Sequence, residues 1–283
     1  MPAATPLVRI DTFNRLTIYA KLENLEPSGS VKYRTVSRML DDAISSGELK
    51  AGMRLVEVTS GNTGIALALR GKELDHKVTI VASQLATEET KRMIEGYGAE
   101  IIESDSYAKG VKLVEKMMRE EPGRWYWTRQ TSNPSSLKAT IALGKEILGQ
   151  FKNQFGGTID YYVGSIATGS TLSGVGKAFK DANPQAIVYR VAPKAEFKYP
   201  GVEDVDETSM SLIPIFDNAV VDEVIKVDEN DAIDATRELN TRYNHNVGVS
   251  SGADFFAAKE LAERHEGNCV IIFPDSGDRY HIL

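Results

Sequence analysis

The chain has 283 residues, of which 42% are hydrophobic and 26% charged, and it carries a net charge of −7. This composition is that of a soluble globular protein with one large or two modest domains. The acidic balance argues against nucleic acid and anionic membranes as partners, because both attract clustered positive charge. No apolar run reaches the roughly 20 residues that span a bilayer, and the first residues lack the features of a secretory signal, so we expect a cytoplasmic protein.

Cys269 is the one cysteine of the sequence, which excludes an internal disulfide and a zinc site built from several cysteines. It lies in the apolar run 268–273, where we expect a buried and unreactive thiol. The four histidines are scattered along the chain and do not suggest a metal centre.

Short β-branched runs alternate with longer helical stretches, as they do in parallel α/β sheets. In chain order, the runs predict strands over residues 16–21, 54–58, 77–82, 100–103, 159–164, 187–192 and 269–273. The helical stretches predict helices over residues 31–45, 62–72, 87–97, 106–121, 135–151, 171–182, 229–242 and 252–265. Segment 193–217 has the least pattern, and a long irregular insert in a compact domain is usually functional or mobile.

The first of three polar strand-to-helix junctions follows the predicted strand 54–58 and reads Thr59-Ser60-Gly61-Asn62-Thr63-Gly64. Free N–H groups at a helix start, flanked by hydroxyls, form an anion-binding surface. Ser and Asn are also ordinary helix caps, but six polar or glycine residues in succession exceed what a cap requires. We therefore expect this junction to bind an anion.

Two further junctions carry the same residue types. The second reads Gly164-Ser165-Ile166-Ala167-Thr168-Gly169-Ser170-Thr171, and it places N–H and hydroxyl donors at the positive end of a helix. It lacks the Gly-Lys-Ser/Thr ending of a nucleotide P-loop, which disfavours ATP or GTP hydrolysis. The third, Pro274-Asp275-Ser276-Gly277-Asp278, follows the last predicted strand, where open α/β sheets bind ligands, although an ordinary polar turn explains it equally well.

Lys32 begins a predicted helix directly after a Pro-Ser-Gly turn. Most lysines are solvated surface charges, and that is the default interpretation of Lys32. A lysine held beside a phosphate-binding loop can instead form a Schiff base with a carbonyl cofactor.

Together these motifs resemble the fold type II family of pyridoxal-phosphate enzymes, and within it the cysteine synthase branch of O-acetylserine and O-phosphoserine sulfhydrylases. The resemblance covers nearly the whole chain from Thr5-Pro-Leu-Val-Arg9 onward. Its most specific elements are Pro27-Ser-Gly-Ser-Val-Lys32 and Thr59-Ser-Gly-Asn-Thr-Gly64. Supporting motifs, in the family's order, are Gly98-Ala-Glu100, Gln130-Thr-Ser-Asn-Pro134, the loop Ala167–Thr171, Gly248-Val-Ser-Ser-Gly-Ala253 and Pro274-Asp-Ser-Gly277.

By this resemblance, Lys32 carries the cofactor pyridoxal 5′-phosphate through a Schiff base and acts as the catalytic base. Asn62 contacts the phenolic oxygen of the cofactor, and Ser276 faces its pyridine nitrogen. The phosphate lies against Ala167, Thr168, Gly169, Ser170 and Thr171. The α-carboxylate of the substrate binds Thr59, Ser60, Thr63 and Gln130. A neutral serine at the pyridine nitrogen makes the ring a weaker electron sink than a carboxylate would, which favours loss of a β-leaving group.

The sequence departs from the family pattern at four places. Tyr33 stands where Asp usually follows the lysine, and the phosphate loop has Ala167 and Ser170 where glycines are usual. The segment after Pro134 lacks the usual His and Thr-Thr-Gly run, and segment 193–217 matches poorly.

The resemblance implies two three-layer α/β domains with mostly parallel sheets, the tryptophan synthase β-like fold. The smaller, mobile domain covers residues 36–137, and residues 1–35 and 138–283 form the larger, cofactor-binding domain. The implied protein is a homodimer that exchanges the β-substituent of an activated serine for sulfide and releases L-cysteine.

Two alternatives stay open. The first is a serine/threonine dehydratase or a cysteine desulfhydrase, in which water ends the reaction; dehydratases usually carry Ser-Phe-Lys and Gly-Asn-His, whereas this chain has Ser-Val-Lys32 and Gly-Asn-Thr63. The second is a non-catalytic relative that binds a ligand or a partner, suggested by Tyr33, Ala167 and Ser170.

The leaving group depends on the cations near the β-carbon. O-phosphoserine brings about two negative charges near pH 7 and needs a cation, ideally an arginine fork. Segment 193–217 offers Lys194 and Lys198 but no arginine, and its acidic middle opposes an anion. Arg34 and Arg279 are the other candidates. The balance favours O-acetylserine.

Overall fold

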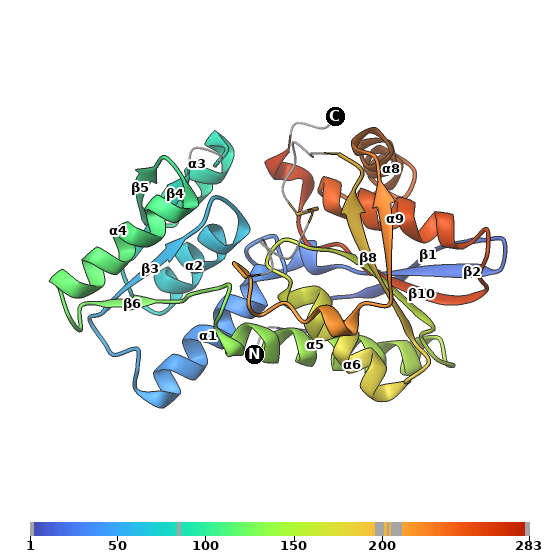
Figure 1. Cartoon of the computed structure of the whole chain (residues 1–283), viewed down its shortest axis with the longest axis horizontal. Coiled ribbons are helices and arrows are strands. Elements are labelled where there is room, and N and C mark those ends of the chain that lie inside the picture. The colour runs from blue at the N-terminus through green and yellow to red at the C-terminus, as the bar shows by residue number, and fades with distance from the viewer. Residues whose placement is uncertain (1–2, 84–85, 196–200, 203, 205–210, 281–283) are drawn as a thin grey trace.

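The computed structural model describes residues 3–83, 86–195, 201–202, 204 and 211–280. Lys198 and part of the irregular segment 193–217 therefore lie outside the described residues. Two separate β-sheets, each covered by helices, organise the rest of the chain (Figure 1).

The larger sheet has six strands in the order β1-β2-β10-β7-β8-β9. β1 (Leu7–Phe13) is antiparallel to β2 (Leu16–Lys21), and all other neighbours in this sheet are parallel. The parallel strands are β7 (Tyr161–Ser165), β8 (Ile187–Pro193), β9 (Glu223–Val227) and β10 (Gly267–Ile272). Helices α5 (Pro134–Gln154) and α6 (Ser170–Ala182) cover one face, and α8 (Glu229–Thr241) and α9 (Val249–Leu261) cover the other (Figure 1).

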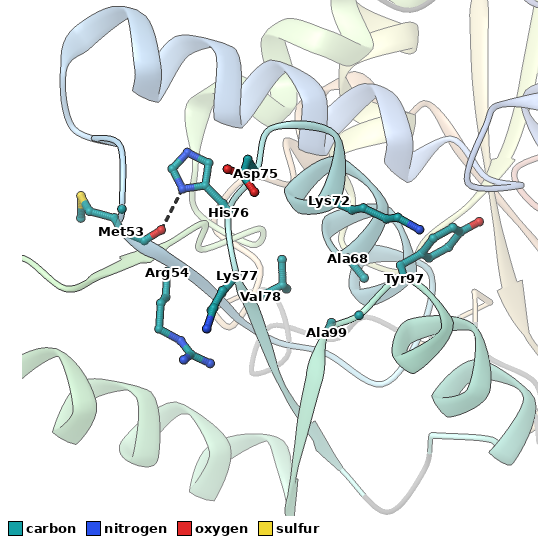
Figure 2. A pocket seen from close by; sticks show the side chains of 12 residues that line it. Met53, Arg54, Ala68, Lys72, Asp75, His76, Lys77, Val78, Tyr97 and Ala99 are labelled. Carbon is teal, nitrogen blue, oxygen red and sulfur yellow. Dashed lines mark hydrogen bonds between the residues drawn. The ribbon is translucent and has the colours of Figure 1, made fainter.

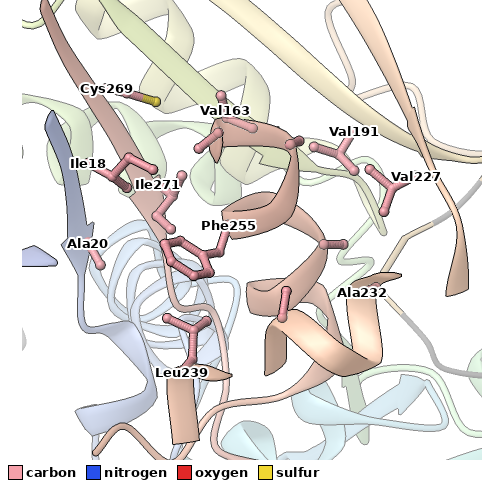
Figure 3. Close-up of a cluster of buried hydrophobic side chains, with 14 of the residues drawn as sticks. Ile18, Ala20, Val163, Val191, Val227, Ala232, Leu239, Phe255, Cys269 and Ile271 are labelled. Carbon is pink, nitrogen blue, oxygen red and sulfur yellow. The ribbon is translucent and has the colours of Figure 1, made fainter. Parts of the chain in front are cut away.

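The near-continuous apolar sequence of β10 follows from this arrangement, because both faces of a central parallel strand are covered. Ile271 packs with Phe255 and Leu239 in the cluster beneath α8 and α9 (Figure 3). Phe273, which follows β10, belongs to the same cluster. Cys269 is fully buried in the same cluster, and burial raises the pKa of its thiol, so the expectation of a buried thiol is confirmed.

The smaller sheet has four parallel strands in the order β5-β4-β3-β6. They are β3 (Arg54–Val58), β4 (Val78–Ser83), β5 (Glu100–Ser104) and β6 (Trp125–Trp127). Helices α1 (Lys32–Ser46), α2 (Asn62–Glu73) and α3 (Glu88–Gly96) pack on one face, and α4 (Tyr107–Glu120) packs on the other.

Short polar motifs set the starts of several helices. Asn133 caps α5, because its side chain accepts a hydrogen bond from Ser135 N at 3.0 Å, and Pro134 occupies the first helical position, which needs no N–H donor. Asp217, Asp228 and Ser276 cap η2 (Asn218–Val220), α8 and η3 (Gly277–Arg279) in the same way. The remaining 3-10 turn is η1 (Glu23–Leu25).

The predicted α/β fold with mostly parallel sheets is confirmed, and each predicted helix and strand has a counterpart whose ends agree within four residues. Three strands, β1, β6 and β9, were not predicted. All strands of the smaller sheet fall between residues 36 and 137, while the boundaries themselves, inside α1 and α5, stay predictions. Within the described residues, no helix combines the length and the apolar character needed to span a membrane.

Candidate active site

The site forms where adjacent strands of the larger sheet end. The carboxyl ends of β2, β10 and β7 lie side by side, because β10 pairs with both neighbours in parallel. The chain leaves β2 towards Lys32, β10 towards Ser276 and β7 towards the loop Ala167–Thr171. Three segments from distant parts of the sequence therefore meet at the sheet edge where parallel α/β proteins bind ligands.

The turn before Lys32 is fixed by backbone hydrogen bonds to the segment after β10. Val31 N donates to Pro274 O at 2.8 Å, and Ser276 N donates to Gly29 O at 3.0 Å. Gly29 has a φ of +68°, and a Cβ there would lie 2.9 Å from Nη2 of Arg279. Glycine is therefore required in this turn, and the turn holds Lys32 at the start of α1.

The amine of Lys32 faces the predicted phosphate loop. Its Nζ donates a hydrogen bond to Oγ1 of Thr168 at 3.1 Å. Burial lowers the pKa of Lys32 to about 8, and the nearby carboxylate of Asp275 partly opposes that shift. A substantial neutral fraction at moderately alkaline pH is what a Schiff-base lysine requires.

The loop before α6 has the form of an anion cradle. Gly169 has a φ of +84°, and a Cβ there would lie 2.5 Å from Cβ of Phe216. The buried hydroxyl of Ser170 has no hydrogen-bond partner among the described residues. Free donors at a helix N-terminus, together with an unsatisfied hydroxyl, fit a phosphate group. The left-handed glycine is retained although Ala167 and Ser170 replace the usual glycines.

Asn62 is held at both ends of its amide. Its Nδ2 donates to Oδ2 of Asp275 at 2.7 Å, and its Oδ1 accepts from Nη1 of Arg279. Tyr280 also donates to Oδ2 of Asp275 at 2.7 Å. These bonds bring the start of α2, on the smaller sheet, against the end of β10 on the larger one. Burial raises the pKa of Asp275 above its ordinary value. The charge of Arg279 and the hydrogen bonds that Tyr280 and Asn62 donate to Asp275 partly oppose this shift.

Ser276 lies on the same segment with its hydroxyl in a polar cluster. Its Oγ donates to Oδ2 of Asp278 at 2.6 Å and accepts from Nδ2 of Asn246 at 3.3 Å. The serine is buried, and its role at a pyridine nitrogen stays a prediction.

A second group of predicted residues surrounds the start of α2. Oγ1 of Thr63 donates to Oε1 of Gln130 at 2.5 Å, across 67 residues of sequence. Oγ1 of Thr59 accepts from Gly61 N at 3.4 Å, and the hydroxyls of Ser60 and Ser83 are 2.5 Å apart. Gly61 precedes the helix, so these hydroxyls and the amide of Gln130 flank a helix N-terminus suited to a carboxylate.

The candidate cations for a phosphate leaving group are engaged elsewhere or exposed. Arg34 is buried, and its guanidinium donates to Glu23 at 2.7 Å and to Glu146 at 2.8 Å. Arg279 donates to Asn62 and to Ser28 O. Lys194 is exposed on the surface. The guanidinium groups of Arg34 and Arg279 are therefore already engaged by partners within the protein.

A surface pocket of about 430 Å³ lies at the amino ends of strands in the smaller sheet, away from the carboxyl ends that lead to the candidate active site (Figure 2). Arg54, Lys72, His76 and Lys77 line it at the amino ends of β3 and β4, and Nδ1 of His76 lies 2.8 Å from Met53 O. Thr59 follows the carboxyl end of β3, so this pocket is separate from the candidate active site.

Two buried carboxylates at the site, Glu57 and Asp275, were not predicted to have a role. The signal in the sequence was an acidic residue inside or directly after an apolar strand, since a buried charge requires partners. Glu57 interrupts Leu55-Val56-Glu57-Val58, and Asp275 follows the apolar run that ends at Phe273.

Comparison with known proteins identifies the family of this chain. Residues 2–275 match the family model described as pyridoxal-phosphate dependent enzyme. The chain is 36% identical over 292 residues to a cysteine synthase of Aquifex aeolicus (strain VF5), an alignment that covers 98% of this chain and 88% of that protein.

Two solved structures share the fold along nearly the whole chain. A hydrogen sulfide-producing enzyme from Fusobacterium nucleatum has a TM-score of 0.87 and 27% identity, covering 98% of this chain and 96% of that one. An O-acetylserine dependent cystathionine beta-synthase from Helicobacter pylori has a TM-score of 0.87 and 27% identity, covering 99% and 95%. The sequence match, the shared fold and a lysine beside an anion cradle lead to one conclusion: this chain belongs to the family of pyridoxal-phosphate dependent enzymes.

Proposed function

We propose that this enzyme makes L-cysteine by exchanging the β-substituent of an activated serine for sulfide. The observation that carries the proposal is the bond from Lys32 Nζ to Thr168 at 3.1 Å, at the start of α6, where the Ser170 hydroxyl has no hydrogen-bond partner within the described part of the chain. The identity of 36% to a cysteine synthase supports the same reaction.

In this proposal, the site residues divide the contacts with the cofactor among them. Lys32 binds it covalently, residues Ala167 to Thr171 hold its phosphate, and Asn62 and Ser276 contact its ring. When bound, pyridoxal phosphate supplies the electron sink that makes the α-proton of an amino acid acidic. Lys32, whose amine is neutral in part near pH 8, takes that proton at Nζ and later returns it to the α-carbon.

The α-carboxylate of the substrate would bind at the start of α2. Thr59, Ser60, Thr63 and Gln130 supply hydroxyl and amide donors there, each expected to contribute about 1.5–3 kcal/mol as a charge-assisted bond. Removing Thr63 or Gln130 should therefore raise the KM for the amino acid strongly while the absorption of the resting cofactor stays unchanged. Unchanged affinity for the amino acid in both variants would mean that the carboxylate binds elsewhere.

We infer that O-acetylserine is preferred over O-phosphoserine as the serine donor. The internal partners of Arg34 and Arg279 support this choice, because a phosphate leaving group would have to compete with Glu23, Glu146 and Asn62 for them. The similarity to an O-acetylserine dependent enzyme supports the same donor.

A β-elimination that releases sulfide from cysteine is the second candidate function. The similarity to a hydrogen sulfide-producing enzyme at a TM-score of 0.87 favours it, and it would use the same site. In replacement, sulfide adds to the β-carbon after the β-substituent of the activated serine has left. In elimination, sulfide itself leaves cysteine, and water then hydrolyses the remaining unsaturated amino acid to a keto acid and ammonia.

Steady-state assays decide between these reactions. The purified enzyme is given sulfide with O-acetylserine or with O-phosphoserine, and cysteine is measured; in parallel, sulfide release from cysteine is measured. We expect cysteine formation with the higher kcat/KM for O-acetylserine. A higher kcat/KM for O-phosphoserine would refute the preference for O-acetylserine. Sulfide release that is faster than cysteine synthesis would refute β-replacement as the function.

The Lys32→Ala variant is the matched control. It should lose turnover and the Schiff-base absorption while keeping its fold. Catalysis with an intact absorption band in this variant would refute the role of Lys32.

The working form, we propose, is a homodimer in the cytoplasm, as the resemblance to cysteine synthases implies. Light scattering behind size-exclusion chromatography should give twice the chain mass of 31.1 kDa. A monomeric mass for the active enzyme would refute the dimer.

A further inference from the structure

We propose that Glu57 is a positioning residue that holds Gln130 in place to bind the substrate's α-carboxylate. This inference rests on the proposed function, since it concerns the carboxylate site at the start of α2. Glu57 itself lies behind that site, inside β3, and acts through Gln130.

Glu57 is a buried carboxylate whose oxygens are satisfied by hydrogen bonds. Only 1% of the residue is exposed. Its Oε1 accepts from Val58 N at 2.7 Å and from Trp127 Nε1 at 3.1 Å. Its Oε2 accepts from Oγ1 of Thr128 at 2.5 Å and from Gln130 N at 3.0 Å. Four donors on one buried carboxylate offset the cost of removing it from water.

Three of these four donors belong to one segment, residues 127 to 130, which leads from β6 to α5. Within it, Arg129 adopts a left-handed backbone with a φ of +51°, which is unfavourable for a residue with a side chain. Ser132 N and Asn133 N both donate to Arg129 O, closing a tight turn. Strain of this kind persists where neighbouring interactions fix the backbone, and Glu57 supplies such interactions on both sides of Arg129.

The turn places the side chain of Gln130 against the substrate site. Its Oε1 accepts from Thr63 at 2.5 Å, and its Nε2 lies 3.4 Å from Val58 O. Gln130 is thus bound to Glu57 through its backbone and to the start of α2 through its side chain. The carboxylate of Glu57 couples β3, β6 and the start of α2 into one preformed receptor.

A glutamine at position 57 cannot accept the same four hydrogen bonds as the carboxylate of Glu57. Glutamine has the same shape, but it presents one oxygen and one NH₂ group to donors that occupy both oxygens of Glu57. Its NH₂ group would face either Val58 N and Trp127 Nε1 or Thr128 and Gln130 N. The turn should then relax, and the donors aimed at the substrate should lose their alignment.

The test compares Glu57→Gln with Asp160→Asn in the holoenzyme. Asp160 is a suitable control because its Oδ2 also accepts a backbone N–H, from Asn268 at 2.8 Å, but at the amino ends of β7 and β10. For Glu57→Gln we expect KM for the amino-acid donor to rise about tenfold or more, with kcat within about threefold and the absorption of the bound cofactor unchanged. For Asp160→Asn, KM should stay within about twofold of the wild type.

A second readout separates this inference from the proposed function. Binding of unreactive L-alanine, followed by the absorption change of the cofactor, should weaken in Glu57→Gln by the same factor as KM, even if the wild type does not make cysteine. Thr128→Val removes the shortest hydrogen bond to Glu57 and should raise KM about threefold or more. This variant tests the same inference if Glu57→Gln does not fold. If Glu57→Gln folds and binds the amino acid as tightly as the wild type, the role of Glu57 is refuted. If Glu57→Gln does not fold, wild-type affinity for the amino acid in Thr128→Val refutes it.

Discussion

At the scale of single residues, the protonation of Lys32 links the site to the stability of the fold. Burial brings its pKa from the ordinary value of 10.5 to about 8, against the opposing charge of Asp275. At a pH between these two pKa values, Lys32 is protonated in the unfolded chain and largely neutral in the folded chain, so the unfolded chain binds more protons. The contribution of Lys32 to stability therefore rises as the pH rises through this window.

The direction of this pH dependence gives a prediction for the protein without its cofactor. Lys32→Met should be more stable than the wild type at pH 7, where the folded wild type holds a partly buried charge. The difference should shrink as the pH rises from about 8 towards 10. Melting temperatures at pH 7 and pH 10 measure it, with Lys194→Met as the exposed control. An equal difference at both pH values would show that the pKa of Lys32 is not depressed.

The sequence predicted a set of candidate site residues but not how their side chains are held. The motifs around Lys32, Asn62 and Gly169 are local, so a resemblance to a family could find them. The partners of Glu57 lie up to 73 residues away, and Asn62 meets Asp275 across 213 residues. Such pairings depend on where the two sheets place their edges, and a one-dimensional pattern does not contain that information.

At the scale of elements, the conformation before α6 decides whether the loop Ala167–Thr171 can cradle an anion. Gly169→Ala would place a Cβ 2.5 Å from Cβ of Phe216 in a backbone with a φ of +84°. We expect a loss of roughly 1–3 kcal/mol in stability and a weaker affinity for the cofactor.

A glycine inside a helix provides the matched control. Gly149 lies in α5, and a Cβ there would meet nothing within 4 Å. Gly149→Ala should therefore stabilise the protein by about 0.5–1 kcal/mol, the opposite sign. Urea unfolding of both holoproteins measures the two effects. A neutral or stabilising Gly169→Ala would contradict the tight fit of this loop.

The three strands that the sequence did not predict have individual physical reasons. β6 has only three residues, too few for an alternating pattern. β1 contains a register shift between Arg9 and Asp11, which breaks the alternation of buried and exposed side chains. β9 lies at the edge of its sheet and is mostly exposed, so it lacks the continuous apolar run of the central strands.

At the scale of the whole molecule, the site depends on contact between the two sheets. Asn62, which follows the smaller sheet, is held by Asp275 and Arg279, which follow the larger one. The residues proposed to bind the substrate's carboxylate are on the smaller-sheet side, and those proposed to bind the cofactor's phosphate are on the larger-sheet side. Relative movement of the two units would therefore change the distance between the two anion sites.

The most direct test of this account is to locate the cofactor's covalent attachment in the purified holoenzyme. Borohydride reduction fixes the Schiff base, and mass spectrometry of the digested protein then identifies the modified lysine. We expect the yellow colour to bleach and the phosphopyridoxyl group to be found on the peptide containing Lys32. A modification on any other lysine, or a colourless protein that takes up no cofactor, would contradict it.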